Sequence, residues 1–121
     1  DQNGLHLAYE GPYALTGKSY SEADWFRGVM KKGVYISDVF LGYRQVPHFI
    51  MAVSRSSDNR QWVLRSTIDP RFFNDLVKNV SIGKTGEAYL LNTANVFQTD
   101  ELAGGRLMKE DTKIAAAMAA R

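Results

Sequence analysis

The chain of 121 residues contains no cysteine, which excludes three kinds of chemistry. Without thiols the protein can have neither a disulfide framework nor a thiolate metal site, and no cysteine can act as a nucleophile. No apolar run approaches the roughly 18–20 residues that a membrane-spanning helix needs. The chain opens with Asp1-Gln-Asn-Gly4, without an initiator Met or a visible signal peptide. We therefore expect it to be a piece of a longer protein.

The sequence also lacks a large excess of either positive or negative charge. The 15 Lys and Arg residues against 13 Asp and Glu give a net charge of +2, and only Lys31 and Lys32 are adjacent. No basic stripe with interleaved aromatic residues is present, so nucleic acid is not an expected partner. The hydrophobic share of 45% and the charged share of 23% are ordinary for a globular protein, and the length suits one domain.

Catalytic motifs are incomplete. Gly83-Lys-Thr85 looks like the end of a phosphate-binding loop, but that loop requires a glycine where this chain has Lys78. No serine is flanked by glycines in the spacing of a nucleophile elbow. His6 and His48 have no carboxylate or histidine companion at helical spacing. The sequence therefore predicts no metal site, no cofactor and no catalytic residue.

The coarse pattern predicts a domain of mixed helices and strands. Ser21 is expected to cap a helix, with Asp24 as the reciprocal capping-box acid, and Gly33 to end it. Asp69-Pro70 is typical of the start of a second helix, and an alanine-rich helix is expected from Thr112. Strands are expected over residues 5–9, 34–41, 48–55, 61–68, 87–92 and 96–99.

The stretch 61–69 is the most informative of these. Its two neighbours, 34–41 and 49–53, are apolar on almost both faces, as in strands that are covered on both sides. A half-polar face on the adjoining strand then indicates a small polar hollow, a pocket for a small molecule. The alternative is that Arg65 and Thr67 simply face water. One face of the stretch carries Trp62, Leu64, Ser66 and Ile68, and the other Val63, Arg65, Thr67 and Asp69.

The order of these elements resembles the extracytoplasmic Cache sensor regions of bacterial transmembrane receptors, especially of double-Cache sensor histidine kinases. The resemblance extends to about Leu107. It implies an α+β, PAS-like fold: a five-stranded antiparallel sheet in the order 2-1-5-4-3, with helices on both faces. The ligand would then lie between the sheet and the helix that carries Trp25. The motifs that carry the resemblance are residues 20–26, 35–40, 47–53, 62–69 and 82–92.

The resemblance also implies a division of the chain. Residues 1–82 would be the membrane-distal subdomain without its first strand, since 5–9 matches the second strand of the family. Residues 83–121 would begin a second subdomain, or form a hairpin and helix that complete the sheet. Residues 87–92 are expected to fill the missing position, either beside 61–68 or donated by a second copy in a swapped homodimer. The rival explanation is a first strand lost from before Asp1.

Site residues on the helix and the next strand follow from the resemblance. Trp25 and Phe26 lie where the family has a Trp-Tyr pair over its pocket. Tyr35, with Ser37 or Asp38, matches a Tyr-x-Asp pattern on the following strand. Plain core packing is the alternative for Trp25 and Tyr35, whereas Asp38 stands in an apolar run and needs a partner if it is buried.

The charged site residues depart in part from the family pattern. Asp69 matches an aspartate that holds the ligand amine in amino-acid-binding members, although it is also expected to cap a helix. Those members carry an arginine two residues before the Trp, and here that position is Ala23. We expect Arg65, with Thr67 on the same strand face, to supply the replacement cation for a ligand carboxylate.

The function implied is that of a periplasmic sensor domain in a receptor anchored in the inner membrane by segments outside this chain. It would bind a small polar solute (an amino acid, an amine or a short carboxylate) and pass a conformational shift to a cytoplasmic histidine kinase of a two-component system. The parent could also be a chemotaxis receptor or a cyclic-dinucleotide enzyme. A PAS-like dimerisation or docking module without a small ligand is the alternative from another class.

Overall fold

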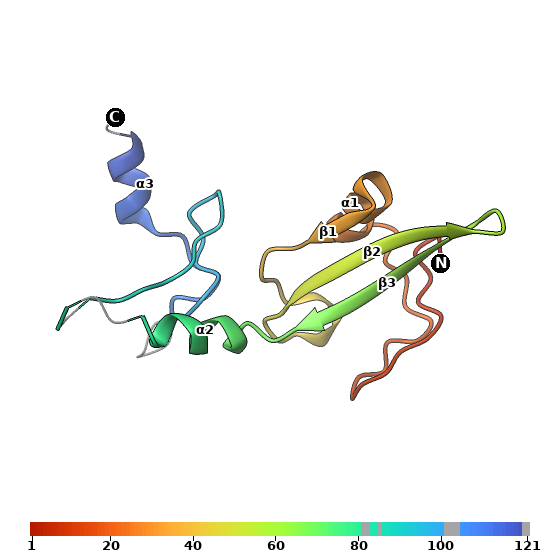
Figure 1. Ribbon diagram of the computed structural model, residues 1–121, viewed down its shortest axis with the longest axis horizontal. Helices are drawn as coiled ribbons and strands as arrows, with labels where there is room; N and C mark the ends of the chain where they lie inside the picture. The colour runs from red at the N-terminus through yellow and green to blue at the C-terminus, as the bar shows by residue number, and fades with distance from the viewer. Residues whose placement is uncertain (81–82, 85, 101–104, 120–121) are drawn as a thin grey trace. The chain divides into compact units, whose positions relative to one another are not determined.

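The structure, a computed structural model, describes residues 1–80, 83–84, 86–100 and 105–119. The chain, which Figure 1 colours by residue number, divides into two compact units. The first unit comprises Asp1–Ser37 and Leu41–Ile68, and the second comprises Asp38–Phe40 and Asp69–Arg121. This division by compactness falls at Asp69. The predicted ranges 1–82 and 83–121 describe the subdomains of the family that the chain resembles. A division into compact units does not test them, so they stay a prediction.

Helices and strands are segregated along the chain, so the fold class is α+β. None of the described helices is long and apolar enough to span a bilayer. The first unit contains α1 (Asp24–Lys32), β1 (Val34–Ile36), the 3-10 turn η1 (Gly42–Arg44), β2 (Phe49–Ser57) and β3 (Arg60–Ile68), and the second contains α2 (Arg71–Lys78) and α3 (Thr112–Ala119).

The sheet of the first unit has three antiparallel strands in the order β1-β2-β3. Its longest ladder joins β2 to β3, from the pair Phe49–Ile68 to the pair Ser57–Arg60. Asp58 and Asn59 alone form the turn between them, with φ of 51° and 58°. Both residue types tolerate this left-handed conformation, and such a two-residue turn matches the twist of a hairpin. The turn therefore fixes the register of β2 against β3.

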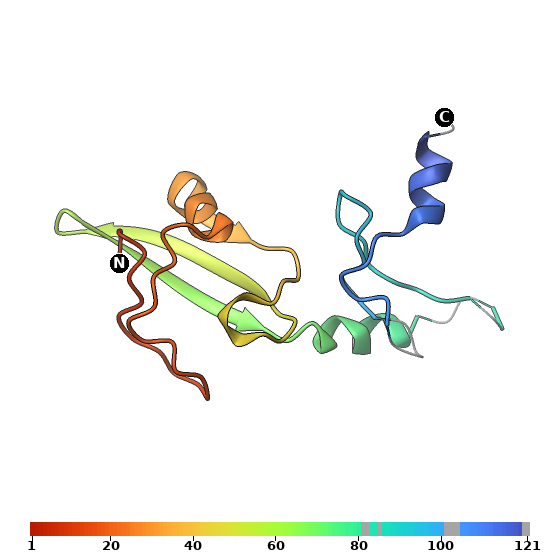
Figure 2. The same ribbon diagram turned by 180° about the vertical axis from the view of Figure 1, so that it is seen from behind.

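One face of this sheet is covered and the other is exposed. Ile50, Ala52 and Ser54 point to the covered face and are 0%, 1% and 7% exposed. The Ser54 hydroxyl donates to the carbonyl of Val29 in α1, which packs against β1 and β2 on this side (Figure 2). The opposite face carries apolar side chains that the described residues leave exposed: Val34, Ile36, Met51, Trp62 and Leu64.

Helix α1 ends where the sequence predicts but begins differently. It buries Trp25, Phe26 and Val29 on one side, and it ends at Gly33, whose N–H donates to the Val29 carbonyl. The predicted capping box is wrong: Ala23 precedes the helix without a side-chain cap, and the Ser21 hydroxyl bonds to that of Ser19 at 3.2 Å. The reason is a preceding turn, in which the N–H of Ala23 donates to the Tyr20 carbonyl.

The five-stranded sheet with helices on both faces is wrong for the described residues. The strand expected over 34–41 ends at Ile36. There the N–H of Ile50 donates to the Ser37 hydroxyl, where a continued strand would offer it a backbone carbonyl. Residues 5–9 form only an isolated bridge, Leu5 to Ser19. Residues 87–92 pair inside the second unit, where Leu91 bridges to Phe97, and so do not fill the sheet.

The second unit is built around a small core of Val39, Phe97 and Thr99, each less than 9% exposed. Their polar groups are bonded within the unit: the N–H of Val39 donates to the side chain of Gln98, and the Thr99 hydroxyl accepts from Leu90. Helix α2 forms as predicted, but no residue in it is buried. Helix α2 therefore contributes no residue to the core among the described residues.

Substitutions on the two sheet faces should change the stability of the first unit by different amounts. Ile50→Val removes a methylene from a fully buried site and should cost about 0.5–1.5 kcal/mol of unfolding free energy. Leu64→Ala, at a position 75% exposed, should change it by less than about 0.5 kcal/mol. Both tryptophans lie in this unit, so urea unfolding followed by their fluorescence measures it selectively. A large loss in Leu64→Ala would contradict an exposed face.

Candidate ligand-binding site

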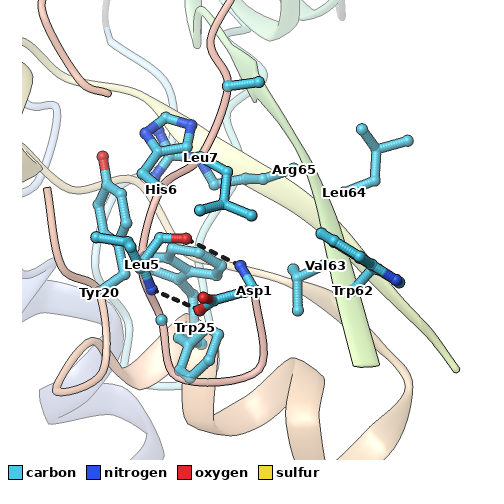
Figure 3. A pocket seen from close by; sticks show the side chains of 13 residues that line it. Asp1, Leu5, His6, Leu7, Tyr20, Trp25, Trp62, Val63, Leu64 and Arg65 are labelled. Carbon is cyan, nitrogen blue, oxygen red and sulfur yellow. Dashed lines mark hydrogen bonds between the residues drawn. The ribbon is translucent and has the colours of Figure 1, made fainter. Parts of the chain in front are cut away.

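A small pocket lies in the first unit between the N-terminal segment, the start of α1 and strand β3 (Figure 3). Its volume of about 260 Å³ is enough for a few heavy atoms, and less than the 300–1,000 Å³ typical of sites for drug-sized ligands. Most of its wall is apolar or aromatic. It is lined by Asp1, Gly4, Leu5, His6, Leu7, Ala8, Tyr20, Trp25, Phe26, Trp62, Val63, Leu64 and Arg65.

Gly4 brings the N-terminal segment to this position. Its φ is +82°, and a Cβ there would lie 2.5 Å from the backbone nitrogen of Ser21. The N–H of Tyr20 donates to the Gly4 carbonyl at 2.8 Å. Only a residue without a side chain permits both the left-handed conformation and this close approach. One wall of the pocket thus depends on a glycine.

Arg65 is the cation of the pocket. Its guanidinium lies 4.7 Å from the ring centre of Tyr20 and 5.1 Å from that of Trp25. One Nη donates to the Thr67 hydroxyl at 3.3 Å. Burial lowers the pKa of Arg65, and attraction to the Tyr20 phenol opposes that lowering. A guanidinium has five N–H donors, and the bond to Thr67 uses one of them.

Trp25 and Phe26 form the aromatic floor. Both are 7% exposed, and their rings meet edge to face with centres 5.8 Å apart. Their positions at the start of α1 give them two roles, since they pack the core and also line the pocket. The alternatives of core residue and site residue therefore do not exclude each other.

Tyr20 and His6 are site residues that the sequence reasoning missed. The Tyr20 hydroxyl is buried without a hydrogen-bond partner among the described residues. The His6 ring packs against Tyr20, and its Nδ1–H donates to the carbonyl of Leu15 at 3.0 Å. Tyr20 belongs to a motif quoted above, but no spacing rule links it to Arg65. His6 was considered only as a metal ligand.

Three other predicted site residues of the first unit do not line the pocket. Tyr35 packs against the backbone of α1 at Gly28, where a Cβ would be 2.3 Å from its ring. Ser37 bonds to Ile50 between β1 and β2. Thr67 accepts the hydrogen bond that orients Arg65, so it acts through that residue.

The two predicted acids belong to the second unit and have partners there. Asp38 accepts a hydrogen bond from the side chain of Asn92 at 2.8 Å. Asp69 accepts from the backbone N–H of Arg71 at 2.9 Å and from its Nε at 2.7 Å. The predicted cap of α2 is thus confirmed as a hydrogen bond, although Pro70 is the residue that directly precedes the helix. An approach of either acid to Arg65 stays a prediction.

The described residues hold no group of three histidines, cysteines or carboxylates that could bind a metal ion. His48 is 4% exposed, and its Nδ1–H donates to the Val46 carbonyl at 2.8 Å. The chemistry available in the pocket is therefore hydrogen bonding, charge and stacking.

Both imidazoles should titrate below their ordinary range. Burial lowers the pKa of His6 and of His48, and the charge of Arg65 adds to both shifts. Because the folded state favours the neutral rings, the unfolded chain takes up more protons, and stability should fall as the pH drops below about 6.5. NMR titration of the ring protons, assigned with His6→Asn, should give two midpoints below that value. A midpoint at or above it would contradict the burial.

The cap at Asp69 can be tested separately from any ligand. Asp69→Asn keeps an acceptor for the Arg71 N–H and should change stability by less than about 1 kcal/mol, whereas Asp69→Ala should lose about 0.5–2 kcal/mol. Hydrogen exchange of the α2 amides measures the difference. The hydrogen bond from Arg71 lowers the pKa of Asp69. The stabilisation by the Asp69 carboxylate should therefore persist as the pH falls past about 3.9, the ordinary pKa of Asp. It should be lost only at a lower pH, where the carboxylate is protonated in the folded protein.

Comparison of the chain with models of protein families, with curated proteins and with solved structures finds no match. The pocket and its residues therefore stand on the geometry described above. Three of the predicted site residues, Trp25, Phe26 and Arg65, are brought together in it. The likeness to Cache sensor regions remains an expectation drawn from sequence motifs.

Proposed function

We propose that this chain is the ligand-sensing region of a bacterial membrane receptor, located in the periplasm, and that the pocket beside Arg65 binds a small polar solute. The observation that carries the proposal is a half-buried guanidinium at a cavity wall, without a carboxylate partner among the described residues. Burying a cation without an anion is costly. A cation kept in such a place is best explained by a ligand that meets it.

Stacking on aromatic rings is the competing explanation for Arg65. Contacts of this kind contribute about 0.5–2 kcal/mol, and they need only the ring faces. They do not use the N–H groups at the edge of the guanidinium. A ligand can accept hydrogen bonds from these N–H groups while the ring faces stay stacked on the guanidinium. The two explanations are therefore compatible.

The same site suggests how a signal begins. Its walls come from the N-terminal segment, from α1 and from β3. A solute that touches all three binds best to the conformation in which they are close, and it shifts the population toward that state. The receptor would transmit this shift to a histidine kinase, with a chemotaxis receptor or a cyclic-dinucleotide enzyme as the alternative parents.

A docking or dimerisation module is the second candidate function. It is favoured by the exposed sheet face, where Val34, Ile36 and Leu64 are 54%, 60% and 75% exposed. Contiguous apolar surface of this kind is typical of interaction sites. The open pocket beside Trp25 and Phe26 favours the ligand sensor, because a pure docking module has no need of a cavity.

A thermal-shift screen of amino acids, amines and carboxylates tests the proposal. A binder at ten times its dissociation constant should stabilise the folded state by about 1.4 kcal/mol and raise the melting temperature by several degrees. Arg65→Ala should abolish the response. Arg60→Ala, which removes an exposed arginine from the same strand, is the control and should keep it. An unchanged response in Arg65→Ala would argue against this site.

A further inference from the structure

Two buried hydrogen-bond donors of the first unit have no acceptor among the described residues: the hydroxyl of Tyr20 and the Nε–H of Arg44. The Arg65 guanidinium lies over the Tyr20 ring, 4.7 Å from its centre. A guanidinium only donates, so it could not accept the hydroxyl proton in any case. Native proteins rarely keep a buried donor without a water, an ion or a ligand. Both donors call for an acceptor.

Arg44 stands in an aromatic stack like that of Arg65. Its guanidinium lies 4.6 Å from the ring centre of Tyr13, and one Nη donates to the Tyr9 hydroxyl at 3.2 Å. The two arginines belong to one cluster of rings, because Arg44 also lies over Tyr9, with its guanidinium 5.7 Å from the ring centre. The His6 ring joins the two stacks, with its centre 5.8 Å from that of Tyr9 and 5.5 Å from that of Tyr20.

The cluster has an excess of positive charge. Neither Arg44 nor Arg65 forms an ion pair among the described residues. Asp1 lines the pocket, but its carboxylate accepts hydrogen bonds from the backbone of Asn3 and Leu5. A negative group from outside the protein would offset part of this charge and also supply an acceptor for the Tyr20 hydroxyl, which belongs to the pocket. An ammonium group would gain neither advantage there.

We propose that the Arg65 end of the pocket binds the carboxylate of a short organic acid, and that the ligand needs no amine. This rests on the proposed function and narrows it. The carboxylate accepts from the Tyr20 hydroxyl and from the edge of Arg65, since a planar carboxylate matches the guanidinium fork. Arg44 is a positioning residue whose charge acts through space. The short hydrocarbon part lies against Leu5, Leu7 and Trp62.

Matched pairs of compounds separate charge from shape. Propionate and succinate are compared with propionamide and succinamide, which have nearly the same volume but no charge. Propylamine, alanine and inorganic phosphate complete the panel. With the whole chain, the acids should raise the melting temperature, while the amides and the amine should leave it unchanged. Alanine should gain nothing over propionate, and phosphate, which has no apolar part, should bind more weakly than either acid.

Conservative variants then test the assigned residues, with the affinity for propionate measured by titration calorimetry. Tyr20→Phe keeps the ring under Arg65 but removes the donor, and should weaken binding by roughly tenfold to a hundredfold. Tyr43→Phe is the control: its hydroxyl donates to the Ser19 carbonyl outside the pocket, and affinity should not change. Arg44→Gln should weaken binding by roughly threefold to tenfold and reduce its dependence on salt.

The outcomes keep the two proposals apart. If no compound of any class stabilises the chain, the ligand-sensing function fails, and this inference fails with it. If the amides, the amine or alanine bind better than the acids, the sensor stands and the carboxylate assignment is overturned. Phosphate binding without carboxylate binding overturns it as well. Equal affinity of Tyr20→Phe and the unchanged protein for propionate removes Tyr20 from the site, and with it the argument from the missing acceptor.

Discussion

The stack of Arg65 on Tyr20 and Trp25 connects strand β3 to a part of the chain that is remote from it in the sequence, namely α1 and the turn that precedes it. The N-terminal segment is held to the same turn by Gly4, so it depends on this arrangement too. A buried guanidinium is costly, and the two rings compensate only part of that cost. Arg65 thereby contacts the aromatic residues of the pocket wall from the opposite strand.

Much of the first unit follows from local sequence. The alternation of residues 61–68 predicts both the strand and the side on which Arg65 and Thr67 lie, because a period of two leaves no other choice. Trp25, Phe26 and Val29 predict the buried side of α1, and Gly33 predicts its end. These features need no knowledge of the rest of the chain, since they depend on spacing within a single element.

The rest could not be predicted because it depends on distant partners. Residues 5–9 have the composition of a strand, but a strand needs a neighbour, and the available one is Ser19 alone. Ser21 is a good capping residue that a turn at Tyr20 displaces from the helix start. The meeting of Tyr20 with Arg65 joins positions far apart in the sequence, and no pattern in either segment records it. Asp69 belongs to the second unit, where it bonds to Arg71, and its place in the ligand site stays a prediction.

Strand β3 is the last strand of the sheet among the described residues, so its outer edge carries backbone groups that no neighbouring strand takes up. An open edge of this kind is a template for pairing with other chains, and proteins usually shield it. Here the shield is the N-terminal segment, and the side chain of Gln2 accepts from the edge N–H of Gln61. The same segment lines the pocket. The N-terminal segment therefore serves both ligand recognition and resistance to aggregation. A substitution that moves this segment away from β3 widens the pocket and at the same time exposes the backbone groups at the edge of the strand.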